Sequence, residues 1–356
     1  MKLNYAWLRN SEEDLARFKN FFDESDSPRT LKHLRWQYLD GFQSVAPLVV
    51  LGLPDGDDSN LRLTGIYATF QSQFICDGNI VTGVQSLDTL TSKDFRGKGL
   101  FNHFAKLVYA KSEQQGVSFI YGFPNKNSAH GFFTKLGWTR LDPLPFLVKP
   151  LNTSYLFSRI PFLKKINKLI PNIRLIPRVP ILHIGLKLIE NISLDSRYDD
   201  LWDTFRNTFK VGLDRGSKYL QWRLSRPGEQ YLNIACLDEE GTILAICIYT
   251  NRDKHGGKIG YIMDLIHRPG AEHEAKAVLN TALIDLAQKG CDAVLAWCFG
   301  HSVNYASYRK SGFFVLPERI RPIELHFGAR AFNASLQAVI SQRDSWYISY
   351  LDSDTV

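Results

Sequence analysis

The order of apolar and polar residues predicts a chain in which helices alternate with short strands. Near the N-terminus, Ser11 precedes EEDLARFKNFF, and the acidic Asp14 three positions later approaches a capping box at a helix start. The apolar residues of this predicted helix share one face: Leu15, Phe18, Phe21 and Phe22. A second helix is predicted at about 31–39.

Four β-prone runs follow, separated by turns rich in Asp, Gly and Asn. They are APLVVLGLP at 46–54, LRLTGIYATFQ at 61–71, SQFICDG at 72–78 and NIVTGVQSLDTL at 79–90. Short strands joined by such turns predict an antiparallel meander that leads into a central strand. Later in the chain, one short strand is predicted at Val117–Phe123 and another at Trp138–Val148.

The stretch after the fourth run has the residues of an anion-binding turn. The strand meets RGKG at 96–99, and a helical pattern begins directly afterwards, with Leu100, Phe104, Leu107 and Val108 on its apolar face. Gly97 and Gly99 permit a turn that other residues resist and let the backbone approach a ligand closely. Lys98, Leu100 and Phe101 would supply outward amides at the positive end of the helix dipole, so we expect an anion to bind there.

Two motifs in this region resemble signatures of the GNAT superfamily of acyl-CoA N-acyltransferases. DFRGKGLF resembles the pyrophosphate loop, in which Gln or Arg is followed by any two residues, Gly, any residue, and Gly or Ala. Arg96 and Gly99 match, whereas Phe101 stands where the family prefers Gly or Ala. PNKNSAHGFFTKLGW at 124–138 resembles the second signature, an Asn-bearing loop and a helix that ends in Lys-Leu-Gly-aromatic.

The resemblance implies that acyl-CoA is the co-substrate and that no metal is needed. In the family the central strand splays from its neighbour, so that backbone amides face the thioester and the pantetheine arm. The positions assigned to acyl-CoA in this way are Leu90, Thr91, Arg96, Gly97, Lys98, Gly99, Leu100, Phe101, Asn125 and Asn127.

Composition is typical of a soluble protein with about two domains. The chain has 356 residues, of which 44% are apolar and 22% are charged. A net charge of +7 favours anionic partners. Charge alone does not distinguish between nucleic acid, lipid head groups and phosphorylated ligands such as CoA. The five cysteines form no C-x-x-C pair and lie mostly in apolar runs, so we expect reduced core residues and a cytoplasmic protein. No apolar run reaches 18 residues, so no integral membrane segment is expected.

The second half of the chain repeats the plan of the first. KYLQWRL at 218–224 echoes KHLRWQY at 32–38, and RKSGF before the end of the second copy echoes TKLGW in the first. KIGYIMDLI matches the central strand, so that Asp264 corresponds to Asp88, but the following HRPGAEHE contains no RGKG. We therefore expect an α/β fold (α+β) of two tandem GNAT-like domains, each a mixed, mostly antiparallel sheet flanked by helices, with a degenerate second copy.

The expected domains are 1–149, which carries the acyl-CoA loop, and 199–356. Between them, 150–198 is a basic and apolar stretch interrupted by prolines, which forbid one long helix. Two interpretations stay open for it: a linker packed across both domains, which we favour, or an amphipathic surface that contacts membrane or a partner.

Acyl transfer to an amine requires a base for the acceptor ammonium, a site for the oxyanion and an exit for the thiolate. Asp88 lies on the central strand two residues before Leu90, and a carboxylate there could orient the ammonium and take its proton. His130 is the second candidate base. The family's general-acid tyrosine corresponds to Phe133, which cannot donate a proton, and we read Tyr308 at the matching place in copy two as a core residue.

The resemblance is closest to tandem-GNAT proteins of bacterial polysaccharide synthesis that acylate nucleotide-linked amino sugars. The expected reaction moves an acetyl or short acyl group, such as 3-hydroxybutyryl, from acyl-CoA to the amino group of a nucleotide-linked deoxyamino sugar. Other interpretations are an acyltransferase of another small amine, a Fem-type peptidyltransferase that uses aminoacyl-tRNA, and a non-catalytic acyl-CoA sensor. The intact RGKG loop argues against the Fem type, and no nucleic-acid partner is expected.

Overall fold

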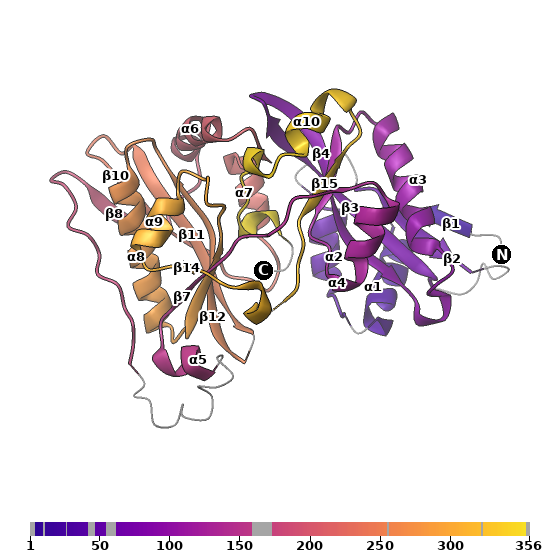
Figure 1. Ribbon diagram of the computed structural model, residues 1–356, viewed down its shortest axis with the longest axis horizontal. Helices are drawn as coiled ribbons and strands as arrows, with labels where there is room; N and C mark the ends of the chain where they lie inside the picture. Colours follow the sequence, from indigo (N-terminus) through magenta and orange to yellow (C-terminus); the bar gives the residue numbers. More distant parts are fainter. Residues whose placement is uncertain are drawn as a thin grey trace. The chain divides into compact units, whose positions relative to one another are not determined.

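The computed structural model describes residues 4–9, 11–25, 27–41, 47–54, 62–158, 173–254, 256–321 and 323–353. The chain forms two compact units (Figure 1). Unit 1 consists of Met1–Pro143 and Leu325–Ser345, and unit 2 consists of Leu144–Glu324 and Trp346–Val356. Each unit therefore combines a long segment with a short C-terminal one, whereas the sequence suggested two consecutive domains.

Unit 1 is built on a sheet with the strand order β1-β2-β3-β4-β5-β15-β6. The strands are β1 (Asn4–Trp7), β2 (Val49–Leu53), β3 (Gly65–Cys76), β4 (Asn79–Thr91), β5 (Phe119–Gly122), β15 (Gly328–Ala331) and β6 (Thr139–Arg140). The described helices are α1 (Glu12–Glu24), α2 (Leu31–Tyr38), α3 (Leu100–Gln114), α4 (Lys126–His130) and α10 (Gln337–Ile340). Only β4 and β5 pair in parallel along this order, so the predicted mixed, mostly antiparallel sheet is confirmed.

Helices cover both faces of this sheet because successive strand residues point to opposite sides. Val49 and Leu51 of β2 pack with α1 and α2, whereas Val50 packs with α3 on the other face. The predicted start of α1 is confirmed, since the Ser11 hydroxyl accepts a hydrogen bond of 3.2 Å from the backbone N–H of Asp14. The two layers of helices fix the central strand β4 between them.

Two strand predictions need correction. The adjoining runs at 61–71 and 72–78 contribute to one strand, β3, because no glycine or proline lies near their junction to end it. The single strand expected at Trp138–Val148 is two strands, β6 and β7 (Phe146–Pro150). Pro143 and Pro145 lie between them, and a proline has no N–H for a sheet ladder.

Unit 2 repeats the architecture with a seven-stranded sheet in the order β14-β7-β13-β12-β11-β10-β8. Its strands are β14 (Phe314–Val315), β7, β13 (Ala293–Trp297), β12 (Gly257–His267), β11 (Ile243–Lys254), β10 (Leu232–Leu237) and β8 (Lys187–Glu190), and a short strand β9 (Val211–Leu213) lies outside this order. Its described helices are α5 (Thr153–Ser158), α6 (Ser196–Phe205), α7 (Ser217–Leu224), α8 (Glu272–Gln288) and α9 (Tyr305–Lys310). The apolar face of α8 packs on β10, β11, β12 and β13 to form the core of the unit.

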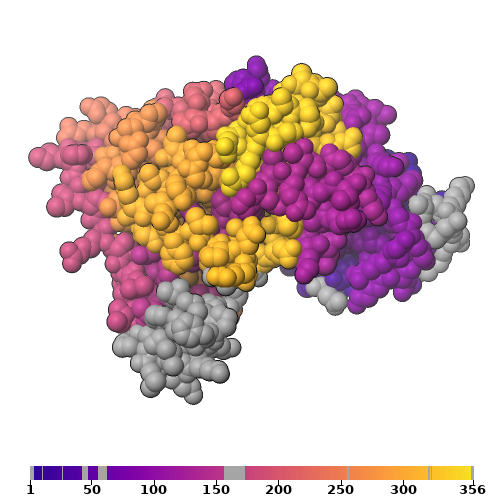
Figure 2. All heavy atoms as spheres, in the orientation of Figure 1, coloured from indigo at the N-terminus to yellow at the C-terminus, as the bar shows by residue number. Residues whose placement is uncertain are grey.

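Each strand order includes a strand that is distant in the chain from its neighbours. β15, near the C-terminus, inserts between β5 and β6 in unit 1, and β7, which follows β6 along the chain, inserts between β13 and β14 in unit 2. In Figure 2 the yellow atoms of the C-terminal segment of unit 1 lie against magenta atoms of the same unit. One of these contacts is the hydrogen bond from Arg330 to the Leu136 carbonyl, at 2.9 Å.

Part of the proline-interrupted stretch, residues 159–172, lies outside the described residues, so the two interpretations of that part remain open. The described remainder packs on unit 2, where Leu182 and Leu186 contact the core and β8 pairs with β10. Ile181 and Ile184 are exposed, at 92% and 103% of the reference area. Among the described residues, no helix is both long enough and apolar enough to cross a bilayer.

Candidate functional site

The central strand of unit 1 separates from its parallel neighbour halfway along its length. β4 pairs with β5 from Gly83 to Ser86, and the last pair joins Ser86 to Gly122. β4 then continues to Thr91, paired only with β3 among the described strands. Because alternate peptide groups of a strand point to opposite neighbours, the groups of Leu87–Thr91 that face away from β3 are open to a ligand.

A β-bulge lies where the two strands separate. Tyr67 pairs with Thr89 and Thr69 pairs with Ser86, so that Leu87 and Asp88 of β4 together lie opposite the single residue Ala68 of β3. An extra residue of this kind turns the strand locally and changes the direction of its side chains. The bulge therefore sets the direction of the Asp88 side chain at the opening.

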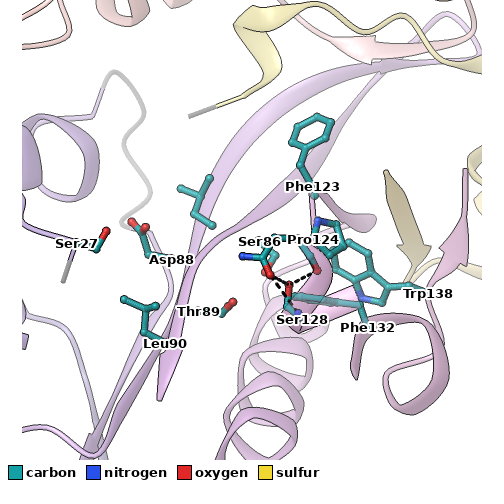
Figure 3. Close-up of a pocket in the computed structure, with 13 residues that line it drawn as sticks. Ser27, Ser86, Asp88, Thr89, Leu90, Phe123, Pro124, Ser128, Phe132 and Trp138 are labelled. Atoms are coloured by element: carbon teal, nitrogen blue, oxygen red, sulfur yellow. Dashed lines mark hydrogen bonds between the residues drawn. The ribbon is translucent and has the colours of Figure 1, made fainter. Parts of the chain in front are cut away.

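A cavity of about 160 Å³ lies at this opening. It is lined by Ser27, Ser86, Leu87, Asp88, Thr89, Leu90, Gly122, Phe123, Pro124, Asn125, Ser128, Phe132 and Trp138. Figure 3 shows the Asp88 and Leu90 side chains on the side of Ser27 and Thr89 on the side of Ser128. Of the positions predicted from the sequence, Asp88, Leu90 and Asn125 line this cavity.

Asp88 is held by two side chains that the sequence analysis did not identify. The Tyr38 hydroxyl donates a hydrogen bond of 2.7 Å to Oδ2, and the Arg29 guanidinium lies 3.4 Å from Oδ1. The Asp88 side chain is 10% exposed and the Arg29 side chain 30%. The carboxylate thus has a fixed direction and still reaches the cavity, which suits it to orient a cationic group.

A buried chain of hydroxyl groups fixes the other side of the cavity. Ser86 donates to the Tyr67 hydroxyl at 3.1 Å, the hydroxyls of Tyr67 and Tyr109 are 3.2 Å apart, and the indole N–H of Trp138 donates to Tyr109 at 2.8 Å. Burial raises the pKa of Tyr109 to about 12 and raises the pKa of Tyr67 well above its ordinary value. Both phenols therefore stay neutral, and the chain positions Ser86 and Trp138 without adding charge.

The glycine turn that precedes α3 has the conformation expected from the sequence. Gly97 and Gly99 have φ values of 77° and 79°, and Gly99 is the N-cap of α3 without a side-chain cap. Such a start leaves first-turn amides to a ligand or to water. Arg96 and Lys98 are exposed beside the turn, with the Lys98 ammonium 4.5 Å from the centroid of the Phe95 ring.

Phe101 fits the turn although it departs from the family pattern. Its ring packs inward, 5.1 Å from the Phe132 ring and 6.0 Å from the Tyr67 ring, measured between centroids. A Cβ atom at Gly131 would lie 2.6 Å from the Phe101 ring, so Gly131 provides the space that the larger side chain needs. Phe101 is therefore a half-buried residue that packs against the core, and its side chain leaves the turn open.

The second motif forms a short helix whose start is capped from within. The Asn125 side-chain oxygen accepts hydrogen bonds from the N–H groups of Asn127 and Ser128, at 2.9 and 3.2 Å. Asn127 is exposed. His130 is exposed at the end of α4 and does not line the cavity. Phe133 also lies outside the lining, with its ring beside the Arg140 guanidinium, 4.5 Å from the ring centroid.

Unit 2 has the equivalent strand, but the residues that follow its parallel pairs are buried. β12 pairs in parallel with β13 up to Ile262 and carries an extra residue, Met263, opposite β11, so that Asp264 takes the position of Asp88. Residues 263–267 are all buried, whereas 87–91 in unit 1 are half-buried. The Tyr347 hydroxyl donates a hydrogen bond of 2.5 Å to Asp264. A side chain from the C-terminal segment of the same unit therefore lies against this carboxylate.

The internal repeat extends to the ion pair at this aspartate. Arg29 and Arg215 each precede the matching tryptophan by seven residues, and each pairs with the aspartate of its own unit, Asp88 or Asp264. The pair in unit 2 is fully buried, and Arg215 also contacts Asp352 at 2.5 Å. Asp88 and Asp264 therefore correspond, as predicted: each lies two residues after the last parallel pair of its strand, and each pairs with the matching arginine.

Comparison with known proteins identifies the fold. No family model matches the sequence, and no curated protein matches it. Solved structures do resemble the chain. A GCN5-related N-acetyltransferase from Anabaena variabilis has 12% identity and a TM-score of 0.63, with 95% of this chain and 75% of that chain covered.

Two further solved structures resemble the chain over nearly its whole length. Saccharomyces cerevisiae N-myristoyltransferase with bound myristoyl-CoA has 11% identity and a TM-score of 0.61, over 92% of this chain and 82% of that one. A tandem GNAT protein from the clavulanic acid biosynthesis pathway has 10% identity and a TM-score of 0.59, over 93% of this chain and 98% of that one. The chain thus has a mixed α/β fold in which two mixed sheets are flanked by helices. This is the fold of tandem GNAT proteins, as the sequence predicted.

Proposed function

We propose that this chain is an acyl-CoA-dependent N-acyltransferase whose single catalytic site lies in unit 1. The observation that carries the proposal is the separation of β4 from β5 beside a cavity, in the same unit as an uncapped glycine turn at the start of α3. The glycine turn would bind the pyrophosphate of CoA, and the opening would receive the thioester. Neither feature alone specifies the reaction, but together they provide a place for the pyrophosphate and a place for the thioester of one acyl-CoA molecule.

The residues proposed to bind acyl-CoA are those expected from the sequence. Leu90 and Thr91 would present backbone groups to the pantetheine arm and to the thioester oxygen. The loop from Arg96 to Phe101 would bind the pyrophosphate, and Asn125 with Asn127 would contact the cofactor from the second motif. An amide aimed at the developing oxyanion stabilises the tetrahedral intermediate more than the ground state, which accelerates the transfer.

Asp88 is proposed to orient the acceptor ammonium and to accept its proton, directly or through water. The neutral amine nitrogen then attacks the thioester carbon and a C–N bond forms. The attacking nitrogen releases its second proton to water, the C–S bond breaks, and CoA leaves as its thiolate. Tyr38 and Arg29 would keep the carboxylate directed at the cavity. Phe133 offers no proton, so water protonates the thiolate. His130 remains the second candidate base, although it does not line the cavity.

The acceptor is proposed to be the amino group of a nucleotide-linked deoxyamino sugar used for surface polysaccharide. Support comes from the order of elements, the glycine loop and the degenerate second copy, which resemble tandem proteins of that kind. The net charge of +7 also favours a diphosphate-bearing partner. The acyl group is proposed to be acetyl or a short acyl group such as 3-hydroxybutyryl.

A matrix of acyl-CoA donors against nucleotide-linked amino sugars, read by free thiol, tests this function. We expect thiol release that requires both an acyl-CoA and an amine, with an amide product of matching mass. Binding of acyl-CoA by calorimetry without thiol release for any amine would instead indicate a sensor. The absence of both binding and turnover would refute the acyl-CoA assignment.

A further inference from the structure

Two histidines and a glutamate gather on the surface of unit 2, the unit that holds none of the residues assigned to acyl transfer. The ligand atoms of His183, His273 and Glu274 all lie within 4.8 Å of one another. The two imidazole rings have centroids 5.5 Å apart, and Nδ1 of His273 is 3.8 Å from Oε1 of Glu274. Among the described residues, this is the group whose His, Cys and carboxylate atoms converge closely enough to share an ion.

Both elements that carry the cluster are anchored to the core. His273 and Glu274 lie in the first turn of α8, whose apolar face packs on the sheet of unit 2. His183 lies between Leu182 and Leu186, which both pack against the same core. The polypeptide that carries His183 runs beside α8 on its way to β8 (Figure 1), and the Asn280 side chain of α8 donates a hydrogen bond of 2.7 Å to the Arg178 carbonyl.

Glu274 is the residue that requires explanation. Its side chain is only 9% exposed, and the one ion-pair contact to it among the described residues is the 3.8 Å approach of His273. Burial of a carboxylate is costly unless hydrogen bonds or a cation offset the lost hydration. The helix start contributes a partial positive charge, which is much smaller than a full one.

We propose that His183, His273 and Glu274 bind a divalent transition-metal ion, with Zn²⁺ as the best match. Two imidazole nitrogens and one carboxylate oxygen are a ligand set that Zn²⁺ accepts, and water completes the tetrahedron. Mg²⁺ and Ca²⁺ prefer all-oxygen sites and fit the two nitrogens poorly. Both imidazoles are exposed, so the ion can enter from solvent.

The ion would join the segment that leads to β8 to the start of α8, and it would have a structural role. Bound metal stabilises the folded state because the unfolded chain does not hold the three ligands together. The sequence alone suggested no metal, because His183 and His273 are far apart in the chain and neither belongs to a spaced ligand motif. The proposal is independent of acyl transfer and does not place the ion at the cavity of unit 1.

Titration of the EDTA-treated full chain with Zn²⁺ by calorimetry tests the site, followed by Co²⁺ substitution and thermal unfolding. We expect one equivalent of Zn²⁺, visible absorption bands of four-coordinate Co²⁺ with nitrogen and oxygen ligands, and a higher Tm with Zn²⁺ than with EDTA. His183→Ala, His273→Ala and Glu274→Gln should each weaken Zn²⁺ binding by more than the roughly 10–100-fold typical of an outer-sphere partner.

Two matched controls separate this site from general surface binding. Glu272→Gln removes an exposed carboxylate from the same helical turn, and His103→Ala removes a histidine from unit 1. Both should leave affinity and the Tm shift unchanged. Zn²⁺ binding that survives all three ligand substitutions, or that the controls weaken equally, would overturn the proposal. Because His183 and His273 are exposed, their alanine variants should fold, and circular dichroism checks this.

Discussion

Replacement of Asp88 by Asn tests the proposed reaction most directly. The substitution retains the shape of the side chain and an oxygen that can accept from Tyr38, but it removes the negative charge. An ammonium about 4 Å from a carboxylate gains about 4 kcal/mol at an effective dielectric constant of about 20, before the cost of desolvation. A lost general base typically lowers the rate by a factor of about 100 or more, which equals about 2.7 kcal/mol at about 1.36 kcal/mol for each factor of ten.

We therefore expect Asp88→Asn to lower kcat on the order of 100-fold while acyl-CoA affinity stays unchanged. The deficit should shrink at alkaline pH, because more of the acceptor amine is then already neutral. Arg29 loses its carboxylate partner but is 30% exposed and can be hydrated, so the stability cost should be about 1 kcal/mol or less. Steady-state thiol release across pH, acyl-CoA calorimetry and thermal unfolding measure the three quantities.

Asp23→Asn is the matched control, since Asp23 is an exposed carboxylate of the same unit that pairs with Lys19 on α1. It should leave kcat unchanged. Near-wild-type turnover of Asp88→Asn at neutral pH would refute the reasoning, and Asp88 would then be a structural carboxylate like its buried counterpart Asp264. His130→Ala would decide whether the base is His130 or solvent.

Three further predictions concern the turn, the leaving group and the second unit. Gly99→Val should abolish acyl-CoA binding. Gly78→Val should not, although Gly78 lies at a β-turn with a similar φ of 76° and equally open space. Equal affinity of both variants by calorimetry would argue against the loop assignment. Phe133→Tyr should change kcat by no more than a few fold, and a large gain would mean that thiolate protonation limits the rate. Asp264→Asn should lower the free energy of unfolding by about 3–5 kcal/mol in denaturant, because the fully buried Arg215 keeps only Asp352 as a carboxylate partner among the described residues. A change below about 1 kcal/mol would mean that the buried pair of Arg215 and Asp264 contributes little to stability.

The sequence by itself determined the local parts of this protein. The capping residue Ser11 starts α1, and the β-prone run at 79–90 forms β4 because such preferences act within a few residues. The RGKG turn needed positive φ values, and only glycine adopts them without strain, so Gly97 and Gly99 marked the start of α3. The internal repeat also located both copies of the fold, because KHLRWQY in α2 and KYLQWRL in α7 repeat one sequence phrase.

Tertiary structure decided which distant residues meet. Arg29 and Asp88 are 59 residues apart, and nothing in their local sequence indicates that they pair. The exchange of β7 and β15 between the two sheets was equally hidden, because strand pairing depends on the register and space offered by the whole sheet rather than on the strand's own residues. The same reason applies to His183, which reaches α8 only because Leu182 and Leu186 pack into the core of unit 2. Local preference fixes the elements, and the burial of apolar faces fixes which side chains they bring together.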